Sequence, residues 1–260
     1  MSSYQKLVNG MSELGIQKMQ EYLDYYIDEV NRGNRSFTEA LAELVEIERK
    51  HNQTRREQAN VKTANFPFIK TVEDFDFDFQ PDINKKEILE LNTLRFLDRH
   101  DNILFVGSSG TGKTHLATAI GISCAKARNI TYFITFEKLM NQLKSALHEN
   151  RLETRLKFFA KYKVLIIDEI GYMPIDQDSA NLFFQLIARR YEKNSTMITT
   201  NMPFSRWAEI FGSQHWPMLS WTGCFTIHQL YPSKGRHTDS ETSVSFWRLT
   251  QQMSDPIIVH

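Results

Sequence analysis

The sequence has little cysteine, with two such residues, Cys124 and Cys224, in 260. A single distant pair matches neither a disulfide framework nor the spacing of zinc ligands, so disulfide-stabilised and zinc-finger classes are excluded. The chain also lacks an excess of either charge, since 31 basic residues balance 31 acidic ones. Contact with nucleic acid or with a membrane surface therefore needs a local patch of charge.

Long apolar runs are absent as well. No stretch approaches the roughly 20 apolar residues of a membrane helix, and the opening MSSYQKLVNGMSELGIQKM lacks the apolar core of a signal peptide. The composition, 41% hydrophobic and 24% charged, is typical of a globular protein. We therefore expect a soluble, cytoplasmic protein with one main domain and a small extension.

The first 64 residues have a helical, polar pattern. Ser36 and Glu39 have the spacing of a capping box, which predicts a helix start. Leu41, Leu44 and Val45 follow at helical spacing and predict a buried stripe. A segment rich in phenylalanine follows from residue 66 to 79, and we expect it to pack against the next domain because exposed aromatic rings are unfavourable.

The same helix carries a basic run near its end. This run either contacts nucleic-acid phosphates or is a solvated helix face, and its charge alone does not choose between the two. The same ambiguity, between subunit contact, DNA contact and plain surface, applies to Arg189 and Arg190. The basic run consists of Arg49, Lys50, Arg55, Arg56 and Lys62.

From Arg95 onward, apolar strands alternate with helices. We expect strands at 102–107, 130–136, 163–169 and 195–201, with helices at 114–129, 137–151 and 179–194 between them. This alternation predicts an α/β fold in which a parallel sheet is flanked by helices.

The segment GSSGTGKTH matches the pattern of a phosphate-binding loop and lies between an expected strand and an expected helix. Its backbone N–H groups would cradle phosphate oxygens, Lys113 would reach the β- and γ-phosphates, and the Thr114 hydroxyl would bind Mg²⁺. The alternative is a chance glycine-rich turn. The expected ATP-binding residues are Gly107, Ser108, Ser109, Gly110, Thr111, Gly112, Lys113, Thr114 and His115.

The segment VLIIDEIGY places an acidic pair after a buried strand. Asp168 would hold Mg²⁺, directly or through water, and Glu169 would act as the general base for an attacking water. The alternative is an ordinary turn at a strand end. Asn201 ends the next strand, where it would sense the γ-phosphate or orient the water, although asparagine is also a common turn residue. The expected catalytic residues are Lys113, Glu169 and Asn201.

With these motifs in place, the chain resembles the ATP-binding helper proteins of IS21-type insertion sequences, the IstB family, within the AAA+ ATPases related to replicative helicase loaders. The resemblance covers nearly all of residues 1–212. It implies an AAA+ P-loop fold with a small N-terminal all-α domain, ATP and Mg²⁺ as cofactors, and ATP-dependent homo-oligomers on duplex DNA that assist a transposase. The segments that carry it are FPFIKTVEDFDFDFQP, ILELNTLRFL, GTGKTHLATAIG, VLIIDEIGYMPID, LFFQLIARRYE and ITTNMPFSRWAEIFG.

We therefore expect an N-terminal helical domain for DNA or partner contact at 1–70, an ATPase core at 71–212 and an aberrant tail at 213–260. Two other functions stay open. One is a helicase loader of the DnaC kind, and the other is a non-hydrolysing, ATP-gated DNA-binding assembly factor. If the wild type turns over ATP and Glu169→Gln abolishes that turnover, the protein is an ATPase rather than a non-hydrolysing assembly factor.

The tail from Ser213 differs in composition, since it holds three basic and three acidic residues of the 31 and 31. The resemblance predicts a helix with an arginine that reaches a neighbouring subunit's ATP, then a final strand, and the printed tail shows neither. Back-translated with freely chosen wobble bases and read one frame over, His215–His228 gives LANAILDRLLHH. We hypothesise a frameshift close to Gly212, and the alternative is a genuine divergent module. If the printed tail is real, we expect ATP to bind but to be hydrolysed poorly.

Overall fold

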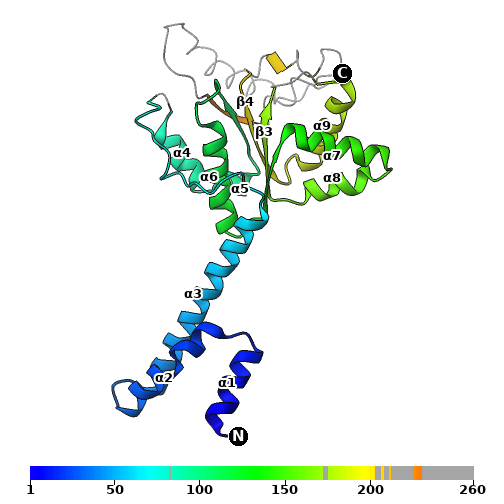
Figure 1. The fold of residues 1–260 in the computed structure, drawn as a ribbon. Helices are drawn as coiled ribbons and strands as arrows, with labels where there is room; N and C mark the ends of the chain where they lie inside the picture. Colours follow the sequence, from blue (N-terminus) through cyan, green and yellow to red (C-terminus); the bar gives the residue numbers. More distant parts are fainter. Residues whose placement is uncertain (82, 172–174, 203–205, 208–210, 212–224, 230–260) are drawn as a thin grey trace, which may run out of the picture. The chain divides into compact units, whose positions relative to one another are not determined.

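The computed structural model describes residues 1–81, 83–171, 175–202, 206–207, 211 and 225–229. The chain forms two compact units, Met1–Lys62 and Thr63–His260 (Figure 1). Within the described residues, no helix has the length and apolar character needed to cross a membrane.

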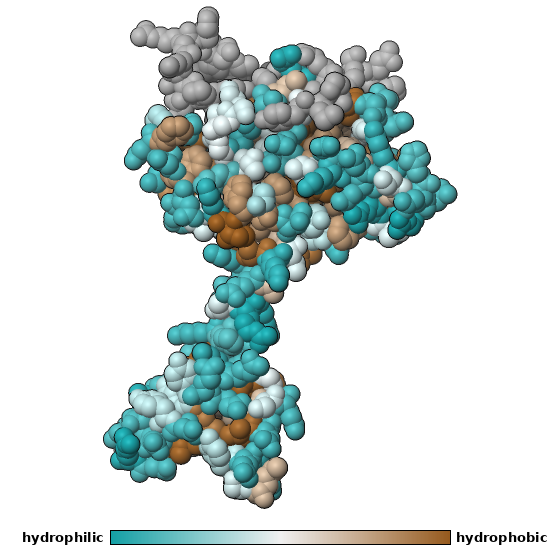
Figure 2. Space-filling view, in the orientation of Figure 1, coloured by the Kyte–Doolittle hydropathy of each residue, from teal (hydrophilic) through white to brown (hydrophobic). Residues whose placement is uncertain are grey.

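The N-terminal unit is built from three helices, α1 (Ser3–Glu13), α2 (Gln17–Asn31) and α3 (Phe37–Thr63). Apolar side chains from all three helices form its core, and Figure 2 shows apolar surface between helices that are otherwise hydrophilic on the visible face. The buried members of this core are Met11, Leu23, Tyr26, Ala40 and Leu44.

The buried face of α3 differs from the predicted one. Leu44 is buried, but Leu41 and Val45 are 40% and 52% exposed, so the predicted stripe is wrong at two of its three positions. The buried face instead continues to Glu48, whose Oε2 accepts a hydrogen bond of 2.8 Å from the backbone N–H of Met19. This carboxylate satisfies a free N–H in the first turn of α2, and a hydrophobic pattern does not reveal a face that includes a glutamate.

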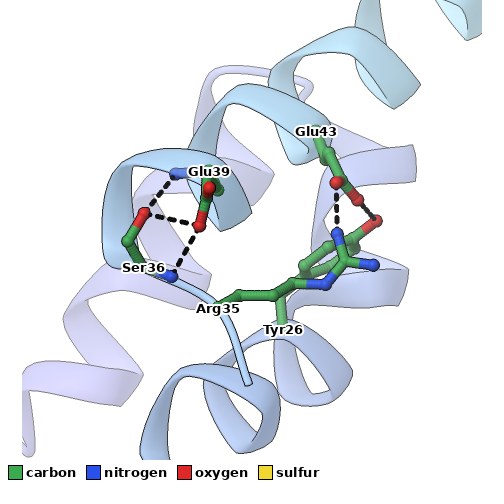
Figure 3. A network of polar contacts seen from close by, with 5 residues as sticks. All are labelled: Tyr26, Arg35, Ser36, Glu39 and Glu43. Atoms are coloured by element: carbon green, nitrogen blue, oxygen red, sulfur yellow. Dashed lines mark hydrogen bonds and ion pairs between the residues drawn. The ribbon is translucent and has the colours of Figure 1, made fainter. Parts of the chain in front are cut away.

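The start of α3 has the predicted capping box, shown in Figure 3. Ser36 Oγ accepts from the N–H of Glu39 at 3.2 Å, and Glu39 Oε2 accepts from the N–H of Ser36 at 2.9 Å. Beside it, the Tyr26 hydroxyl donates to Glu43 at 2.7 Å, and Arg35 forms an ion pair with the same carboxylate. These contacts tie α2 to the first turns of α3.

The second unit is organised around a parallel sheet with the strand order β2-β3-β4-β1-β5. Each pair of neighbouring strands is parallel. The strands are β1 (Asn102–Val106), β2 (Thr131–Thr135), β3 (Val164–Ile170), β4 (Ser195–Thr200) and β5 (Phe225–Gln229).

Helices cover both faces of this sheet (Figure 1). Alternate strand residues face opposite layers: Ile103 and Ile166 pack with the residues of α6, whereas Leu104 and Ile167 pack with those of α7, α8 and α9. The α/β fold with a parallel sheet flanked by helices is therefore confirmed. On one side lie α4 (Lys85–Asn92), α5 (Phe96–Arg99) and α6 (Lys113–Lys126), and on the other α7 (Phe136–His148), α8 (Leu152–Ala160) and α9 (Gln177–Arg190).

The phenylalanine-rich segment packs against the α6 side of the sheet, as predicted. Phe75 is buried there, and Phe66 and Phe77 are partly buried against the same cluster. Phe79 is the exception, because its side chain is 75% exposed. Just before this segment, the carbonyl of Ala64 accepts a hydrogen bond of 2.8 Å from the N–H of Phe133 on β2.

Within the tail, the structure describes β5, which pairs in parallel with β1 along its whole length. The expectation that the printed tail contains no final strand is therefore wrong for Phe225–Gln229. FTIHQ begins with an aromatic residue and two β-branched residues, types that are enriched in strands, and it occupies the edge of the sheet beside β1. The other predictions about the tail, including those for Trp216, Trp221 and Trp247, lie outside the described residues.

Candidate nucleotide-binding site

The predicted motifs meet at one edge of the sheet. The loop at 107–112 joins β1 to α6, the acidic pair ends β3, and Asn201 follows β4. These three strands are neighbours in the order β3-β4-β1, so their carboxyl ends lie side by side. The loop is fixed to this edge because Gly107 N–H donates to the carbonyl of Thr200 at 3.2 Å. Ligand sites in open parallel sheets form at such edges.

Glycines shape the loop and a lysine crosses it. Gly110 and Gly112 have φ values of +82° and +84°, a region that residues with a side chain rarely occupy. The carbonyl of Ser108 accepts from the Thr111 hydroxyl at 2.9 Å and from Lys113 Nζ at 2.7 Å. Lys113 is 6% exposed, and burial lowers the pKa of its ammonium against the opposing effect of the two nearby carboxylates.

The linker residue Phe75 lies directly against the loop. A Cβ placed on Gly112 would be 2.4 Å from Cε2 of Phe75, so a side chain at this position would force the Phe75 ring to move and would also be strained by the positive φ. The ring of Phe75 also packs edge-on against His115, with 5.2 Å between centroids. His115 Nε2 is 3.1 Å from the carbonyl of Thr71. The imidazole of His115, a residue predicted to bind nucleotide, therefore contacts the linker.

The acidic pair splits into a buried and an exposed carboxylate. Asp168 is 3% exposed, and the Thr114 hydroxyl donates to its Oδ1 at 2.9 Å, so the two predicted magnesium ligands are in contact. Burial raises the pKa of Asp168, while the hydroxyl bonds from Thr199 and Thr114 and the charge of Lys113 oppose that rise. Glu169 is exposed.

Asn201 lies at the same edge with an unsatisfied polar atom. Its Oδ1 is buried, and among the residues that the structure describes it has no hydrogen-bond partner. A buried polar atom without a partner is unfavourable unless a ligand or water satisfies it. Together with the desolvated ammonium of Lys113 and the adjacent oxygens of Thr114 and Asp168, it makes the site fit a nucleotide with Mg²⁺.

One residue of the site was not predicted from the sequence. Thr199 is 1% exposed, and its hydroxyl donates to Asp168 Oδ1 at 2.5 Å and accepts from the N–H of Glu169 at 2.9 Å. The only signal in the sequence is a pair of threonines at the end of an otherwise apolar strand. Threonine is common in strands, so that signal is weak.

Arg190 is a structural residue, which excludes the interpretations of it as a surface, subunit or DNA contact. It is 1% exposed, and burial lowers its pKa to about 9. Its neighbour Arg189 forms a bidentate ion pair with Glu153. The Arg190 guanidinium donates to four carbonyls and one hydroxyl, those of Phe159, Ala160, Tyr162, Ser195 and Thr196.

The basic run on α3 divides into paired and unpaired residues. Arg49 forms an ion pair with Glu46 at 2.6 Å. Arg55, Arg56 and Lys62 are exposed, and none of them forms an ion pair with any residue that the structure describes. Figure 2 shows this second half of α3 as mostly hydrophilic on the visible face. These three cations are therefore available to an anionic partner.

Comparison with protein families matches residues 9–218 to the family described as IstB-like ATP binding protein. A protein of Bacillus thuringiensis subsp. berliner, named as an ATP-binding protein of insertion sequence IS232, is 50% identical over 210 residues, covering 81% of this chain and 84% of its own. A protein of Pseudomonas aeruginosa with the same designation for insertion sequence IS21 is 37% identical over 202 residues, covering 78% and 76%.

Solved structures show the same fold at low sequence identity. The DnaC helicase loader superposes with a TM-score of 0.52 at 22% identity, covering 65% of this chain and 98% of its own. AMPPCP-bound DnaA from Aquifex aeolicus superposes with a TM-score of 0.53 at 14% identity, covering 72% of this chain and 56% of its own. The second unit therefore has the AAA+ P-loop fold that the motifs and the resemblance predicted.

Proposed function

We propose that this chain, which belongs to the family of IstB-like ATP binding proteins, hydrolyses ATP and in its ATP-bound state assembles as a homo-oligomer on duplex DNA to assist a transposase. The observation that carries the ATPase proposal is the contact between Thr114 and Asp168 beneath the loop that holds Lys113. The insertion-sequence names of the relatives support the context of transposition.

In this proposal the loop binds the phosphates of ATP. Its backbone N–H groups, from Gly107 to Thr114, and the N-terminus of α6 favour negative charge. Lys113 Nζ would leave the carbonyl of Ser108 for the β- and γ-phosphates. Thr114 and Asp168 would hold Mg²⁺, which when bound would offset the charge on the phosphate oxygens.

Glu169 and Asn201 act on the water that attacks the γ-phosphorus. Glu169 accepts a proton from that water as the new P–O bond forms, and the bond between the γ-phosphorus and the bridging oxygen breaks to release ADP. The side chain of Asn201 contacts the γ-phosphate or orients the water, which would satisfy its otherwise unpaired Oδ1. His115, with its ring against the linker, contributes at most through its backbone.

Two substitutions test this assignment by separating binding from turnover. We expect Lys113→Ala to abolish ATP binding, since it removes the cation of the loop. Glu169→Gln should keep binding but lower turnover by about 100-fold or more, because an amide cannot accept the proton. The measurements are fluorescent-nucleotide binding and phosphate release, with Glu153→Gln as a matched control remote from the motifs.

Unchanged turnover in Glu169→Gln would contradict the role of Glu169. Wild-type protein that binds ATP and DNA without turnover would instead favour the non-hydrolysing assembly factor.

We propose that the DNA-binding surface includes the unpaired cations of α3. Arg55, Arg56 and Lys62 are exposed on the N-terminal unit. Lys and Arg at such positions bind phosphates by displacing counterions, which is independent of base sequence. The neutral net charge of the chain means that this local cluster, rather than a global field, has to attract the duplex.

A further inference from the structure

A bulge separates the two carboxylates of the acidic pair. The register of β3 against β4 shifts between Ile167 and Ile170, so that two residues of β3, Asp168 and Glu169, stand opposite one residue of β4, Thr199. An extra residue in one strand leaves backbone groups without their usual ladder partners and redirects the side chains around it. Here the bulge leaves Asp168 buried and Glu169 exposed.

The hydroxyl of Thr199 contacts both residues of this bulge. It lies 2.5 Å from Asp168 Oδ1 and 2.9 Å from the backbone nitrogen of Glu169. A hydroxyl has one hydrogen, and a carboxylate can only accept, so Thr199 donates to Asp168 and accepts from the Glu169 N–H. Both directions are fixed by chemistry, and both bonds are shielded from water because Thr199 is 1% exposed.

Each of these bonds constrains a proposed functional group. The hydrogen bond from the Glu169 N–H holds the peptide that precedes this residue. Glu169 has a φ of +67°, in the left-handed region that glutamate rarely adopts. The carboxylate bond restricts the rotation of Asp168, and the Thr114 hydroxyl donates to the same Oδ1 at 2.9 Å. One hydroxyl therefore sets the position of the general base and the orientation of a magnesium ligand.

We propose that Thr199 is a positioning residue that keeps Asp168 and Glu169 in the arrangement needed for ATP hydrolysis. This inference rests on the proposed ATPase function of the site. Thr199 acts through Asp168 and Glu169, and it is not assigned any direct contact with ATP or with the attacking water. Removing a residue that hydrogen-bonds to a metal ligand lowers activity or metal affinity by about 10- to 100-fold.

The test compares Thr199→Val, which keeps the shape and removes the hydroxyl, with Thr199→Ser, which keeps the hydroxyl. We expect the valine variant to lower kcat by about 10- to 100-fold with little change in KM for ATP, and serine to restore kcat to within about 3-fold of wild type. In nucleotide-free protein, hydrogen exchange at the Glu169 amide should be at least about 10-fold faster in the valine variant than in wild type or in the serine variant.

Thr118→Val is the matched control. Thr118 is a fully buried threonine of α6, and among the described residues its hydroxyl has no hydrogen-bond partner. The Thr118→Val variant should retain the wild-type kcat and the wild-type rate of hydrogen exchange at the Glu169 amide. If the valine variant does not fold, Thr199→Ala has to show the same loss, since it removes the hydroxyl without placing a new methyl group beside the carboxylate.

The exchange measurement separates failure of this inference from failure of the proposed ATPase function. Wild-type protein without turnover would overturn the ATPase proposal alone, since exchange at Glu169 still reports whether Thr199 holds the bulge. Wild-type kcat and unchanged exchange in Thr199→Val would overturn the positioning role. So would a serine variant as impaired as the valine variant, because the methyl group rather than the hydroxyl would then matter.

Discussion

At the scale of single residues, the number of bonds that a buried cation makes decides whether it can serve a ligand. Lys113 and Arg190 are both almost fully buried, and burial lowers the pKa of each. Lys113 donates to the carbonyl of Ser108, which a phosphate oxygen can replace. Arg190 instead joins the end of α8 to the start of β4 through five acceptors. The first is suited to binding and the second to stability.

We predict that Arg190→Met lowers the free energy of unfolding by at least about 2 kcal/mol, because several buried acceptors lose their donor. Arg189→Met should lower it less, since its ion pair with Glu153 is partly exposed to solvent. Urea denaturation of the two variants beside wild type measures the difference. Equal effects from the two substitutions would contradict the structural role of Arg190.

At the scale of elements, the start of α9 depends on one aspartate. Asp176 Oδ1 accepts from the N–H of Ser179 at 2.8 Å as the helix cap, and its other oxygen accepts from Lys144 on α7 at 2.5 Å. The hydrogen bond from the Lys144 ammonium, followed by that of the Ser179 amide, holds the pKa of Asp176 at about 2, below its ordinary 3.8. The cap therefore also links two of the helices on one face of the sheet.

This cap predicts a pH-dependent contribution to stability. Because the folded-state pKa is depressed, the contribution is fully present above about pH 4 and is lost as pH falls through about 2. Asp176→Asn keeps a capping acceptor but has no charge to lose. Wild type should therefore exceed the asparagine variant in unfolding free energy at pH 5, with a smaller margin at pH 3. A margin that is the same at both pH values in chemical denaturation would contradict the assigned ion pair.

The elements that sequence patterns predict well are those with one dominant period or motif. The apolar strands, the loop around Lys113 and the acidic pair carry such signals, because burial on both faces and phosphate binding restrict residue types strongly. Thr199 has only a weak signal and Glu48 has none, since their importance comes from partners that are brought close by folding. The buried face of α3 could not be predicted from the spacing of apolar residues, because that face includes the charged residue Glu48.

At the scale of the whole molecule, one unit holds the proposed ATP site and the helical unit presents exposed cations on α3. The frameshift hypothesis concerns the remaining part, from Ser213. The strand β5 shows that Phe225–Gln229, with the sequence as printed, can extend the sheet beside β1. Resequencing the coding DNA decides the matter, since a frame that encodes the printed tail, without a slip relative to close relatives, would overturn the hypothesis.

We propose that ATP bound at the loop controls binding of duplex DNA through the cations of α3. The most direct test is the salt dependence of duplex binding, measured with ATP and with ADP. We expect tight, sequence-independent binding of duplex DNA with ATP but not with ADP. The slope of log K against log salt concentration should be about 2 smaller in magnitude in Arg55→Ala/Arg56→Ala than in wild type or in the control Lys85→Ala/Lys86→Ala. Binding that is equal with ATP and ADP, and a slope unchanged by the α3 substitutions, would contradict the account.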